Sequence, residues 1–520
     1  MNLERNCGEN IWEAYGFRGN PFDTKALSVQ PGGSLPIKDA FVGSQTTEEM
    51  RLLNKILSSS GGARLVVEGP VGVGKTTFVN FHRYLWEYEP HGKKLFSAST
   101  EIAIYGSWSV KDFLCNILAH LINKLLITFG EAKICQNKLF EELILLNRVY
   151  IARSLQIEGS VLGFGGGFGR STQMNVPPIS EAQLVFYLQN LIAEILRLGY
   201  SGVILHFDNL ELLNRQELKQ SLTIFEEIRD ILQLDQVFFI FVAQPGFFRK
   251  IISPLERVRS IFLGWPIQIA PLTIQETVEV INRRYRLLAI DANKIILPVE
   301  DELIACLYQL YEGKIRFIMD AIASIIYHLP TCTIHTLPSS SAIEILKNLA
   351  LEKIRRVLTP RELEILRFAS QLPIFTNSEL AKQSHIDSRN IAKYLQRLLD
   401  LHYISLAKKE GRNVFYRIAE DARIIGYEGI PKPPAAHPQT NSETKPPVLA
   451  KPLKDRQRRL LLLLARQPQI TVRQWATDAK IGLATARQDL QSLEQLDYIA
   501  KIGCGRATCY ASKDGTIAVE

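Results

Sequence analysis

The stretch Leu65-Val66-Val67-Glu68-Gly69-Pro70-Val71-Gly72-Val73-Gly74-Lys75-Thr76-Thr77 decides the fold of this 520-residue chain. Its apolar run predicts a buried strand, and this strand leads directly into the pattern G-x-x-x-x-G-K-T, a phosphate-binding loop. Glycines let backbone N–H groups turn towards a polyphosphate, Lys75 supplies positive charge for the β and γ phosphates, and the Thr76 hydroxyl can reach Mg²⁺. A helix beginning near Thr76 adds its N-terminal dipole. We therefore predict that ATP binds at Gly69, Pro70, Val71, Gly72, Val73, Gly74, Lys75, Thr76 and Thr77.

The composition is typical of a folded protein with several domains. Hydrophobic residues make up 46% of the chain and charged residues 22%, and the length corresponds to roughly three or four domains. No apolar run approaches the roughly 20 residues of a membrane span, and the first residues lack the pattern of a secretory signal. The seven cysteines show no zinc-ligand spacing. We expect a cytoplasmic protein without a membrane partner, and its net charge of +8 permits association with the nucleoid.

A second apolar run, from Gly202 to Asp208, ends in a carboxylate. A strand of this kind can place Asp208 opposite Thr76, where the two residues would hold Mg²⁺. The next residue is Asn209, at a position where many ATPases have a glutamate that orients the attacking water. Glu211 could replace that glutamate, or hydrolysis could be slow and the protein could act as an ATP-controlled switch. The sequence leaves this choice open.

Further polar residues follow in a definite order. Gln244 ends a buried strand, Val237 to Ala243, and could contact the γ phosphate or the attacking water. Arg257 and Arg259 precede a short strand, and Pro271-Leu272-Thr273 precedes Glu276 at the spacing of a capping box. Arg316 lies near the start of a later helix. Each arginine alone is typical of a solvated surface, and only the order of these residues suggests a shared site.

This order resembles the AAA+ ATPases, and among them the origin-recognition and initiator branch. The resemblance covers roughly residues 12 to 330 and includes Asn20-Pro21-Phe22. It implies that Asp208 is the Walker B residue, Gln244 sensor 1, Arg257 or Arg259 an arginine finger acting between subunits, and Arg316 sensor 2. It also implies that Phe41, Val42 and Gly43 lie against the adenine, although Ser44 replaces the usual arginine.

The distance between the two motifs predicts an insertion. Lys75 and Asp208 are 208 − 75 = 133 positions apart, more than a compact core needs. We place the insertion at about residues 105–180, with helical apolar spacing in its first part. The stretch 163–169 is too rich in glycine for a packed helix. It could touch DNA or a neighbouring subunit, or it could be a flexible connector.

The C-terminal part of the chain contains an internal repeat. A shift of 95 positions aligns Pro373 with Pro468, Leu395 with Leu490, and Tyr403-Ile404 with Tyr498-Ile499, without a gap. After a one-residue deletion, Gly411-Arg412 aligns with Gly505-Arg506. Two copies of one domain are therefore predicted.

Each copy has the pattern of a winged helix-turn-helix. In the first copy, Ser388 is expected to cap a helix from Arg389 to Leu399, and strands Tyr403 to Leu406 and Val414 to Ile418 flank a basic loop. Outward polar and basic residues suit contacts to phosphates and base edges. The alternative is that these domains bind only proteins. We expect DNA contacts from Arg389, Asn390, Lys393, Arg397, Lys408, Lys409, Arg412, Arg487, Gln488 and Arg506.

These observations divide the chain into consecutive segments. We predict an α/β P-loop AAA+ parallel sheet with a helical lid, followed by two winged helix-turn-helix domains. The segments are an N-terminal segment (1–45), the nucleotide-binding domain (46–270), the lid (271–350), the first winged helix (355–425), a Pro-rich linker (426–453) and the second winged helix (454–515).

The sequence favours an ATP-dependent DNA-binding AAA+ protein that assembles into a homo-oligomer and uses its nucleotide state to control its grip on duplex DNA. Replication initiation and transposition both use such machines, and the sequence does not choose between them. The alternative is a signalling or defence ATPase of the STAND type, whose winged helices bind mainly proteins. A transcription regulator that uses ATP as an allosteric ligand is a third possibility.

Overall fold

The computed structural model describes most of the chain. The described residues are 10–30, 35–43, 47–90, 92–104, 108–146, 179–208, 210, 218–329, 334–411, 413–427, 460, 463–464, 470–479, 481–495, 499–502 and 509–512. They belong to two compact units, Met1–Lys432 and Pro433–Glu520. The Gly-rich stretch 163–169, residues 428–453 of the linker, and the candidate residues Asn209, Glu211, Arg412 and Arg506 lie outside the described residues.

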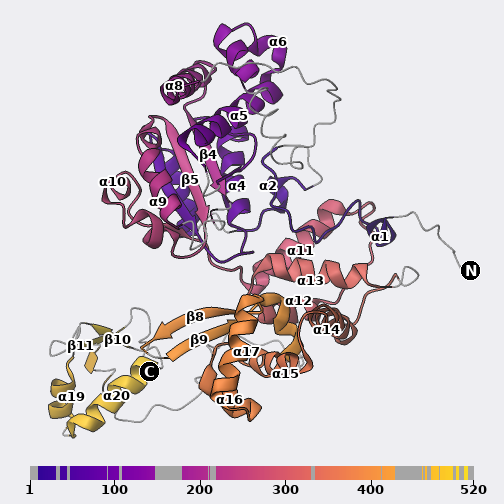
Figure 1. The fold of residues 1–520 in the computed structure, drawn as a ribbon, viewed down its shortest axis with the longest axis vertical. Coiled ribbons are helices and arrows are strands. Elements are labelled where there is room, and N and C mark those ends of the chain that lie inside the picture. Colours follow the sequence, from indigo (N-terminus) through magenta and orange to yellow (C-terminus); the bar gives the residue numbers. More distant parts are fainter. Residues whose placement is uncertain are drawn as a thin grey trace, which may run out of the picture. The chain divides into compact units, whose positions relative to one another are not determined.

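A parallel β-sheet forms the centre of the N-terminal part of the first unit (Figure 1). Its strands are β1 (Ala63–Glu68), β2 (Leu95–Ser97), β3 (Ile102–Ala103), β4 (Gly202–Asp208), β5 (Val237–Ala243) and β6 (Ile267–Gln268). They lie in the order β2-β4-β5-β1-β6, and β3 pairs with β4. All of these pairs are parallel. Because a parallel sheet is covered on both faces, its strands read as continuous apolar runs. The predicted α/β parallel sheet is confirmed.

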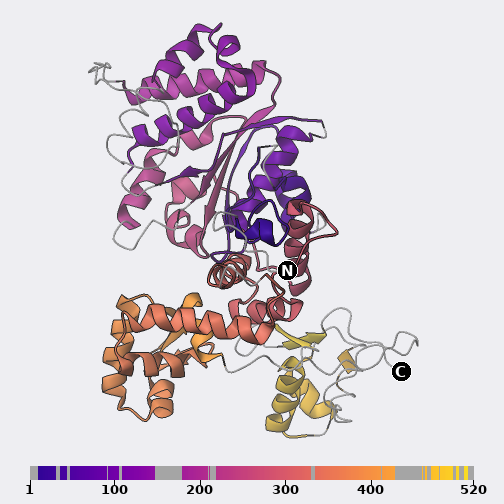
Figure 2. The same ribbon diagram turned by 90° about the vertical axis from the view of Figure 1, so that its right-hand side faces the viewer.

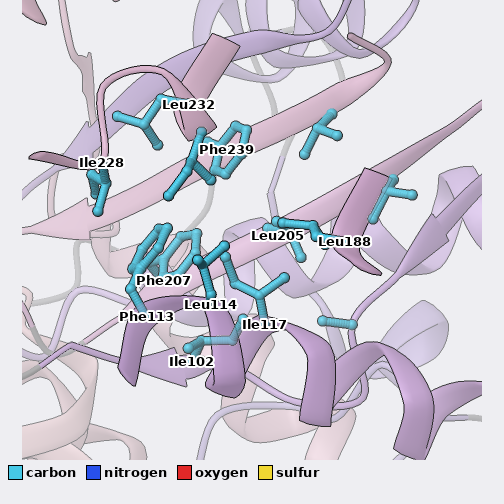
Figure 3. Packing of buried hydrophobic residues seen from close by; sticks show 14 of the residues in the cluster. Ile102, Phe113, Leu114, Ile117, Leu188, Leu205, Phe207, Ile228, Leu232 and Phe239 are labelled. Atoms are coloured by element: carbon cyan, nitrogen blue, oxygen red, sulfur yellow. The ribbon is translucent and has the colours of Figure 1, made fainter. Parts of the chain in front are cut away.

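Helices cover both faces of the sheet (Figure 2). On one face, α3 (Glu48–Leu57) and α4 (Lys75–Tyr88) pack against side chains such as Leu65 and Ile240. On the other face, α5 (Val110–Phe129) and α8 (Glu181–Arg197) pack against β4 and β5. Figure 3 shows Phe113 of α5 beside Phe207 of β4, and their rings stack with centroids 5.2 Å apart. The sheet is therefore the middle of three layers.

Helix α5 begins the predicted insertion. Ser109 caps it in a reciprocal capping box with Asp112, and α6 (Glu131–Ile134) follows. Among the described residues, α5 is the one helix long and apolar enough to cross a membrane. However, its residues Phe113, Ile117 and Leu121 are fully buried in the core of the sheet. Helix α5 is thus a core helix of the folded unit.

The described part of residues 271–350, the predicted lid, contains α11 (Ile274–Leu288), α12 (Asp301–Tyr311), α13 (Ile315–Tyr327) and α14 (Ser339–Arg355). The N-terminal segment packs into the lid, although the two are far apart in the sequence. Trp12 of α1 (Ile11–Ala14), Phe17 and Phe22 share one apolar core with α11 to α14. The ring of Phe17 stacks on that of Tyr285 with centroids 5.3 Å apart. The N-terminal segment is therefore an integral part of the lid core.

The first winged-helix copy follows the lid within the same unit. It contains α15 (Pro360–Ser370), β7 (Phe375–Thr376), α16 (Asn377–Ser384), α17 (Ser388–Asp400), β8 (Ile404–Glu410), β9 (Asn413–Ile418) and η4 (Glu420–Gly426). The strands form an antiparallel sheet in the order β7-β9-β8. This arrangement of helices and a small antiparallel sheet is that of one winged helix.

Two details of this copy differ from the prediction. The cap of α17 is Asp387, whose carboxylate accepts from the Arg389 N–H over 2.8 Å, and Ser388 is already helical. Strand β8 is longer than expected, because Lys408 and Lys409 pair with Phe415 and Val414. A β-bulge at Ala407 precedes these pairs. Because a bulge interrupts the alternation of inward and outward side chains, the sequence pattern did not indicate that the strand continues beyond it.

The described part of the second unit repeats this arrangement. It contains α19 (Val472–Asp478), α20 (Leu483–Gln495), β10 (Ile499–Ile502) and β11 (Cys509–Ser512). The bounds of α20 are those of α17 shifted by 95 positions. The bridge of Ile470 to Tyr510 corresponds to that of Phe375 to Tyr416. The repeat therefore extends from sequence identity to strand register.

Candidate functional site

The phosphate loop joins β1 to α4 and depends on glycine at several positions. Gly72 and Gly74 have φ angles of 83° and 95°, which other residues rarely adopt. A Cβ atom on Gly69 would lie 2.5 Å from the Ile269 carbonyl oxygen, so only glycine allows the chain after β6 to approach the loop. The Lys75 ammonium is nearly buried and donates to the carbonyl oxygens of Gly69 and Pro70, each over 2.9 Å. The loop thus holds its cation in place through its own backbone.

The structure brings the two candidate Mg²⁺ ligands into contact. The Thr76 hydroxyl donates to a carboxylate oxygen of Asp208 over 2.6 Å. Strand β5 lies between β1 and β4, and the parallel order brings the carboxyl ends of these strands to one edge of the sheet. Hydroxyl and carboxylate oxygens fit Mg²⁺, which takes few protein ligands and keeps water or phosphate oxygens in its other positions. Within the described residues, no group of three or more His, Cys, Asp or Glu side chains could hold a metal.

A cavity of about 460 Å³ lies over the loop. The N-terminal segment, the phosphate loop, Asp208, the link from β6 to α11, and α13 all contribute to its wall. Phe41, Val42 and Gly43 are among the lining residues. The Phe41 ring stacks on Phe81 of α4 with centroids 4.1 Å apart. The volume and the polar phosphate end suit a nucleotide.

Arg316 also belongs to this cavity. Arg316 is among the lining residues, and its backbone N–H donates to the Gly72 carbonyl over 3.1 Å. A Cβ atom on Gly72 would lie 3.1 Å from the Cβ atom of Arg316. The start of α13 therefore rests directly on the phosphate loop.

The other candidate residues lie away from the cavity wall. Gln244 is exposed after β5, and its carbonyl accepts from the Phe247 N–H over 3.2 Å. Arg257 and Arg259 are exposed on α10 (Glu256–Arg259). Within the described residues, neither guanidinium forms an ion pair. The structure thus groups Thr76, Asp208 and Arg316 around one cavity, and it does not place Gln244, Arg257 or Arg259 there.

Glu68 is a site residue that the sequence reasoning missed. This buried carboxylate ends β1 and accepts from the backbone N–H groups of Gly246 and Phe248, over 2.9 and 2.6 Å. It also accepts from the Gln268 side chain over 3.1 Å. Glu68 therefore fixes the turn that carries Gln244 relative to the phosphate loop. An acid at the end of an apolar strand was the available signal.

Two arginines of α11 attach the N-terminal segment to the cavity wall. Arg284 donates to the carbonyl oxygens of Pro21 and Asp23, and Arg283 donates to that of Phe41 over 2.6 Å. Burial lowers the pKa of Arg284 to about 10, but the guanidinium stays charged at neutral pH. Because these bonds join side chains to distant backbone, no local sequence pattern revealed them.

A buried polar network supports the phosphate loop from behind. Arg83 of α4 donates to Asn80 over 2.8 Å and to the Ala98 carbonyl, and His206 of β4 contacts Asn80. Burial, and then the charge of Arg83, lower the pKa of His206 to about 4, so its ring is neutral at pH 7. The network ties α4 to β4 and so stabilises the contact of Thr76 with Asp208.

The outward face of α17 is polar and basic. Ile391, Leu395 and Leu398 are buried in the core of the first winged-helix copy. Arg389, Asn390, Lys393 and Arg397 are exposed on the other face. Lys408 and Lys409 are exposed on β8, where Lys408 also pairs with Glu410 over 2.9 Å. In the second unit, Arg487 and Gln488 are exposed on α20.

No protein-family model and no curated protein sequence matches the chain. Solved structures do match. The ORC2 protein of Aeropyrum pernix aligns at 14% identity with a TM-score of 0.40, over 79% of this chain and 98% of that one. The ORC1 protein of the same organism, solved in complex with DNA, aligns at 10% identity with a TM-score of 0.36, over 79% of this chain and 97% of that one. Cdc6p of Pyrobaculum aerophilum aligns at 14% identity with a TM-score of 0.34, over 76% and 95%. The chain thus aligns with solved ORC and Cdc6 structures over most of its length, at low identity.

Proposed function

We propose that the chain is an ATP-dependent DNA-binding protein of the AAA+ initiator type, in which the nucleotide state controls the grip on duplex DNA. The observation that carries this proposal is that the first unit contains two kinds of candidate site. It holds both the cavity with Lys75, Thr76, Asp208 and Arg316 and a winged-helix copy with a basic outward helix.

Each residue of the cavity has a definite role in this proposal. Lys75 neutralises the β and γ phosphates, and the backbone N–H groups of the glycine-rich loop bind their oxygens. The Thr76 hydroxyl and the Asp208 carboxylate would hold Mg²⁺, which shields charge on the phosphates. Arg316 adds a second positive charge beside the loop. Phe41 to Gly43 form the wall on the adenine side.

Hydrolysis would require further residues. Glu211 is the proposed carboxylate that positions the attacking water, with Gln244 beside the γ phosphate. Arg257 or Arg259 of a second copy would complete the site, which makes the active form a homo-oligomer. Their exposure and lack of ion pairs within the described residues support this role. Glu211→Gln should abolish ATP turnover, measured as phosphate release. Unchanged turnover would mean that another residue positions the attacking water.

We also propose that both winged-helix copies contact DNA. The residues of α17 that face away from its core carry positive charge and side-chain amide groups. These are the groups that bind phosphates and base edges in a major groove. Lys408, Lys409 and Arg412 would follow the backbone beside it, with Arg487, Gln488 and Arg506 in equivalent places of the second copy.

A nucleotide-binding experiment on the full-length protein tests the first half of the proposal. Replacing Lys75 with Ala should weaken ATP binding about 10- to 100-fold, because a charged hydrogen-bond donor to phosphate is lost. Duplex DNA binding in the absence of nucleotide should be unchanged. Lys93→Ala, at an exposed position outside the cavity wall, serves as the control. Unchanged ATP affinity in Lys75→Ala would contradict the assignment of the loop.

One observation favours a second candidate, a nucleotide-controlled switch of the STAND type. Asn209 follows Asp208 at a position where many ATPases have a glutamate. The ATPase rate and the oligomeric size, each measured with and without DNA, separate the two candidates. A DNA-binding ATPase should show turnover or assembly that responds to DNA. A switch with protein partners should retain its nucleotide and show no response to DNA.

A further inference from the structure

The turn between α12 and α13 has an unusual backbone conformation. Glu312 has a φ angle of 55° and Gly313 one of 72°, so two consecutive residues are left-handed. For a residue with a side chain, such a conformation costs about 1 to 3 kcal/mol and persists only where its surroundings hold it. A Cβ atom on Gly313 would lie 2.7 Å from the Leu272 carbonyl oxygen. Residues 312–314, which we call the lid turn, are therefore pressed against the start of the lid.

One side of the lid turn faces the nucleotide cavity. Pro271 and Leu272, which contact Gly313, line the cavity. Lys314 is the N-terminal cap residue of α13, and Arg316 lies two positions later with its N–H on the Gly72 carbonyl. A displacement of the lid turn would therefore move Arg316 relative to the phosphate loop.

The other side of the lid turn carries charged contacts to the first winged-helix copy. The Lys314 ammonium pairs with the Glu420 carboxylate at the start of η4. Arg423 of η4 pairs with Glu312 over 2.8 Å and donates to the Leu310 carbonyl over 3.1 Å. Only 8% of the Lys314 side chain and 12% of the Arg423 side chain are exposed. The two cations are largely removed from water, whereas Glu420 and Glu312 are 25% and 43% exposed, so loss of either carboxylate leaves a buried cation poorly compensated.

The electrostatics of Glu312 agree with this arrangement. Burial raises the pKa of its carboxyl group, but Arg423, Lys314 and Arg417 together outweigh burial and hold that pKa below its ordinary value. Glu312 is therefore ionised at neutral pH and available to all three cations.

The η4 segment connects these contacts to the candidate DNA-binding helix. Ala422 of η4 is buried in the same apolar core as Ile391 and Leu395 of α17. Ile424 of η4 is buried in the core of the lid. A segment shared by two cores cannot shift in one without strain in the other, because protein interiors are close-packed.

We propose that the lid turn couples the nucleotide cavity to the first winged-helix copy, with Lys314 and Glu312 as positioning residues that hold Arg316 against the phosphate loop through Glu420 and Arg423. This inference rests on the proposed function, since its output is DNA affinity. The contacts to the winged helix thus help to set the geometry of the nucleotide site. By thermodynamic reciprocity, DNA binding then alters nucleotide affinity by the same factor.

The test measures the affinity of the full-length protein for a 30-base-pair duplex at low salt, with no nucleotide, with ADP, and with a non-hydrolysable ATP analogue. In the wild type, the analogue and ADP should give affinities that differ by about 5- to 150-fold. In Glu420→Gln this ratio should fall towards 1, although the protein still binds each ligand. The control is Lys353→Gln, which removes an exposed pair with Asp421 of η4 and should keep the wild-type ratio. A wild-type ratio in Glu420→Gln, or a ratio of 1 in the wild type, would overturn the inference.

Hydrogen exchange separates failure of the inference from failure of the proposed function. The Ala422 and Tyr427 amides, bonded to the Ala419 and Ile424 carbonyls, report on η4 without DNA. The ATP analogue should slow their exchange in the wild type and in Lys353→Gln, but not in Glu420→Gln. Absence of DNA binding with nucleotide-dependent exchange would refute the proposed function and leave the coupling in place. If the exchange rates of these amides in the wild type are the same with and without the ATP analogue, the coupling is refuted, even if the protein binds DNA.

Discussion

The first winged-helix copy and its repeat in the second unit share most of their strand pairs but differ in their charged residues. Under the shift that aligns them, Lys393 and Arg397 correspond to Gln488 and Ser492. After the one-residue deletion, Arg417, which contacts the lid turn, corresponds to Ala511. The buried positions are retained, as in Leu395 and Leu490. The comparison shows that one small core can support two different surfaces, one of which carries the charges that contact the lid.

The largest expected difference between the units concerns acid stability. Burial lowers the pKa of His82 to about 3 and those of His120 and His206 to about 4, and all three lie in the first unit. Below pH 6.5 the unfolded state then binds more protons than the folded state. The contribution of these neutral histidines to the free energy of unfolding is therefore fully present above pH 6.5 and is lost as the pH falls towards 4. Each histidine should lower the free energy of unfolding by about 2 kcal/mol at pH 5 relative to neutral pH. The repeat, residues 454–515, contains no histidine. Thermal unfolding at pH 7.5, 6 and 5 should therefore lower the transition of the first unit more. Equal shifts of both transitions would refute this explanation.

Core truncations at equivalent positions should sharpen the comparison. Leu395→Ala and Leu490→Ala should each cost about 2 to 5 kcal/mol, because both side chains are buried. The first core adjoins the lid through η4, so Leu395→Ala should also weaken ATP binding. Leu490→Ala should leave ATP affinity unchanged. Calorimetry measures the loss of stability in both variants, and nucleotide titration measures their ATP affinity. Weaker ATP binding in Leu490→Ala alone would contradict the expectation that only the first core is linked to the nucleotide cavity.

The smallest expected effect is on DNA affinity. The double variant Lys393→Ala, Arg397→Ala should reduce the salt dependence of duplex binding by about two counterions and the affinity by about 10- to 100-fold. Gln488→Ala with Ser492→Ala is the matched change in the repeat and removes no charge. Its salt slope should equal that of the wild type. A full wild-type slope in the first variant would remove α17 from the DNA interface.

The parts of the structure that could be predicted were those with a local pattern. The strand, loop and helix around Lys75 follow from apolar runs and glycine positions, and the proximity of Thr76 to Asp208 follows because parallel strands end at one edge. The missed features depend on tertiary contacts. Glu68 is recognisable only once the turn at Gly246 lies over it, and Trp12 joins the lid through residues far along the chain. Gln244, Arg257 and Arg259 remain predictions, because their proposed partners belong to a bound nucleotide or a second copy.

The bulge at Ala407 accounts for the length difference between the two repeats. Leu406 pairs with Tyr416 and Lys408 with Phe415, whereas Lys501 and Ile502 pair with Tyr510 and Cys509 without interruption. Ala407 is therefore the added residue. In an unbulged strand, one insertion would exchange the inner and outer faces of every later residue. Here the bulge absorbs it, and added local twist is its main geometric result. A single codon gained or lost at this position is thus enough to give the two hairpins different internal twists, while both copies keep the same hydrophobic interior.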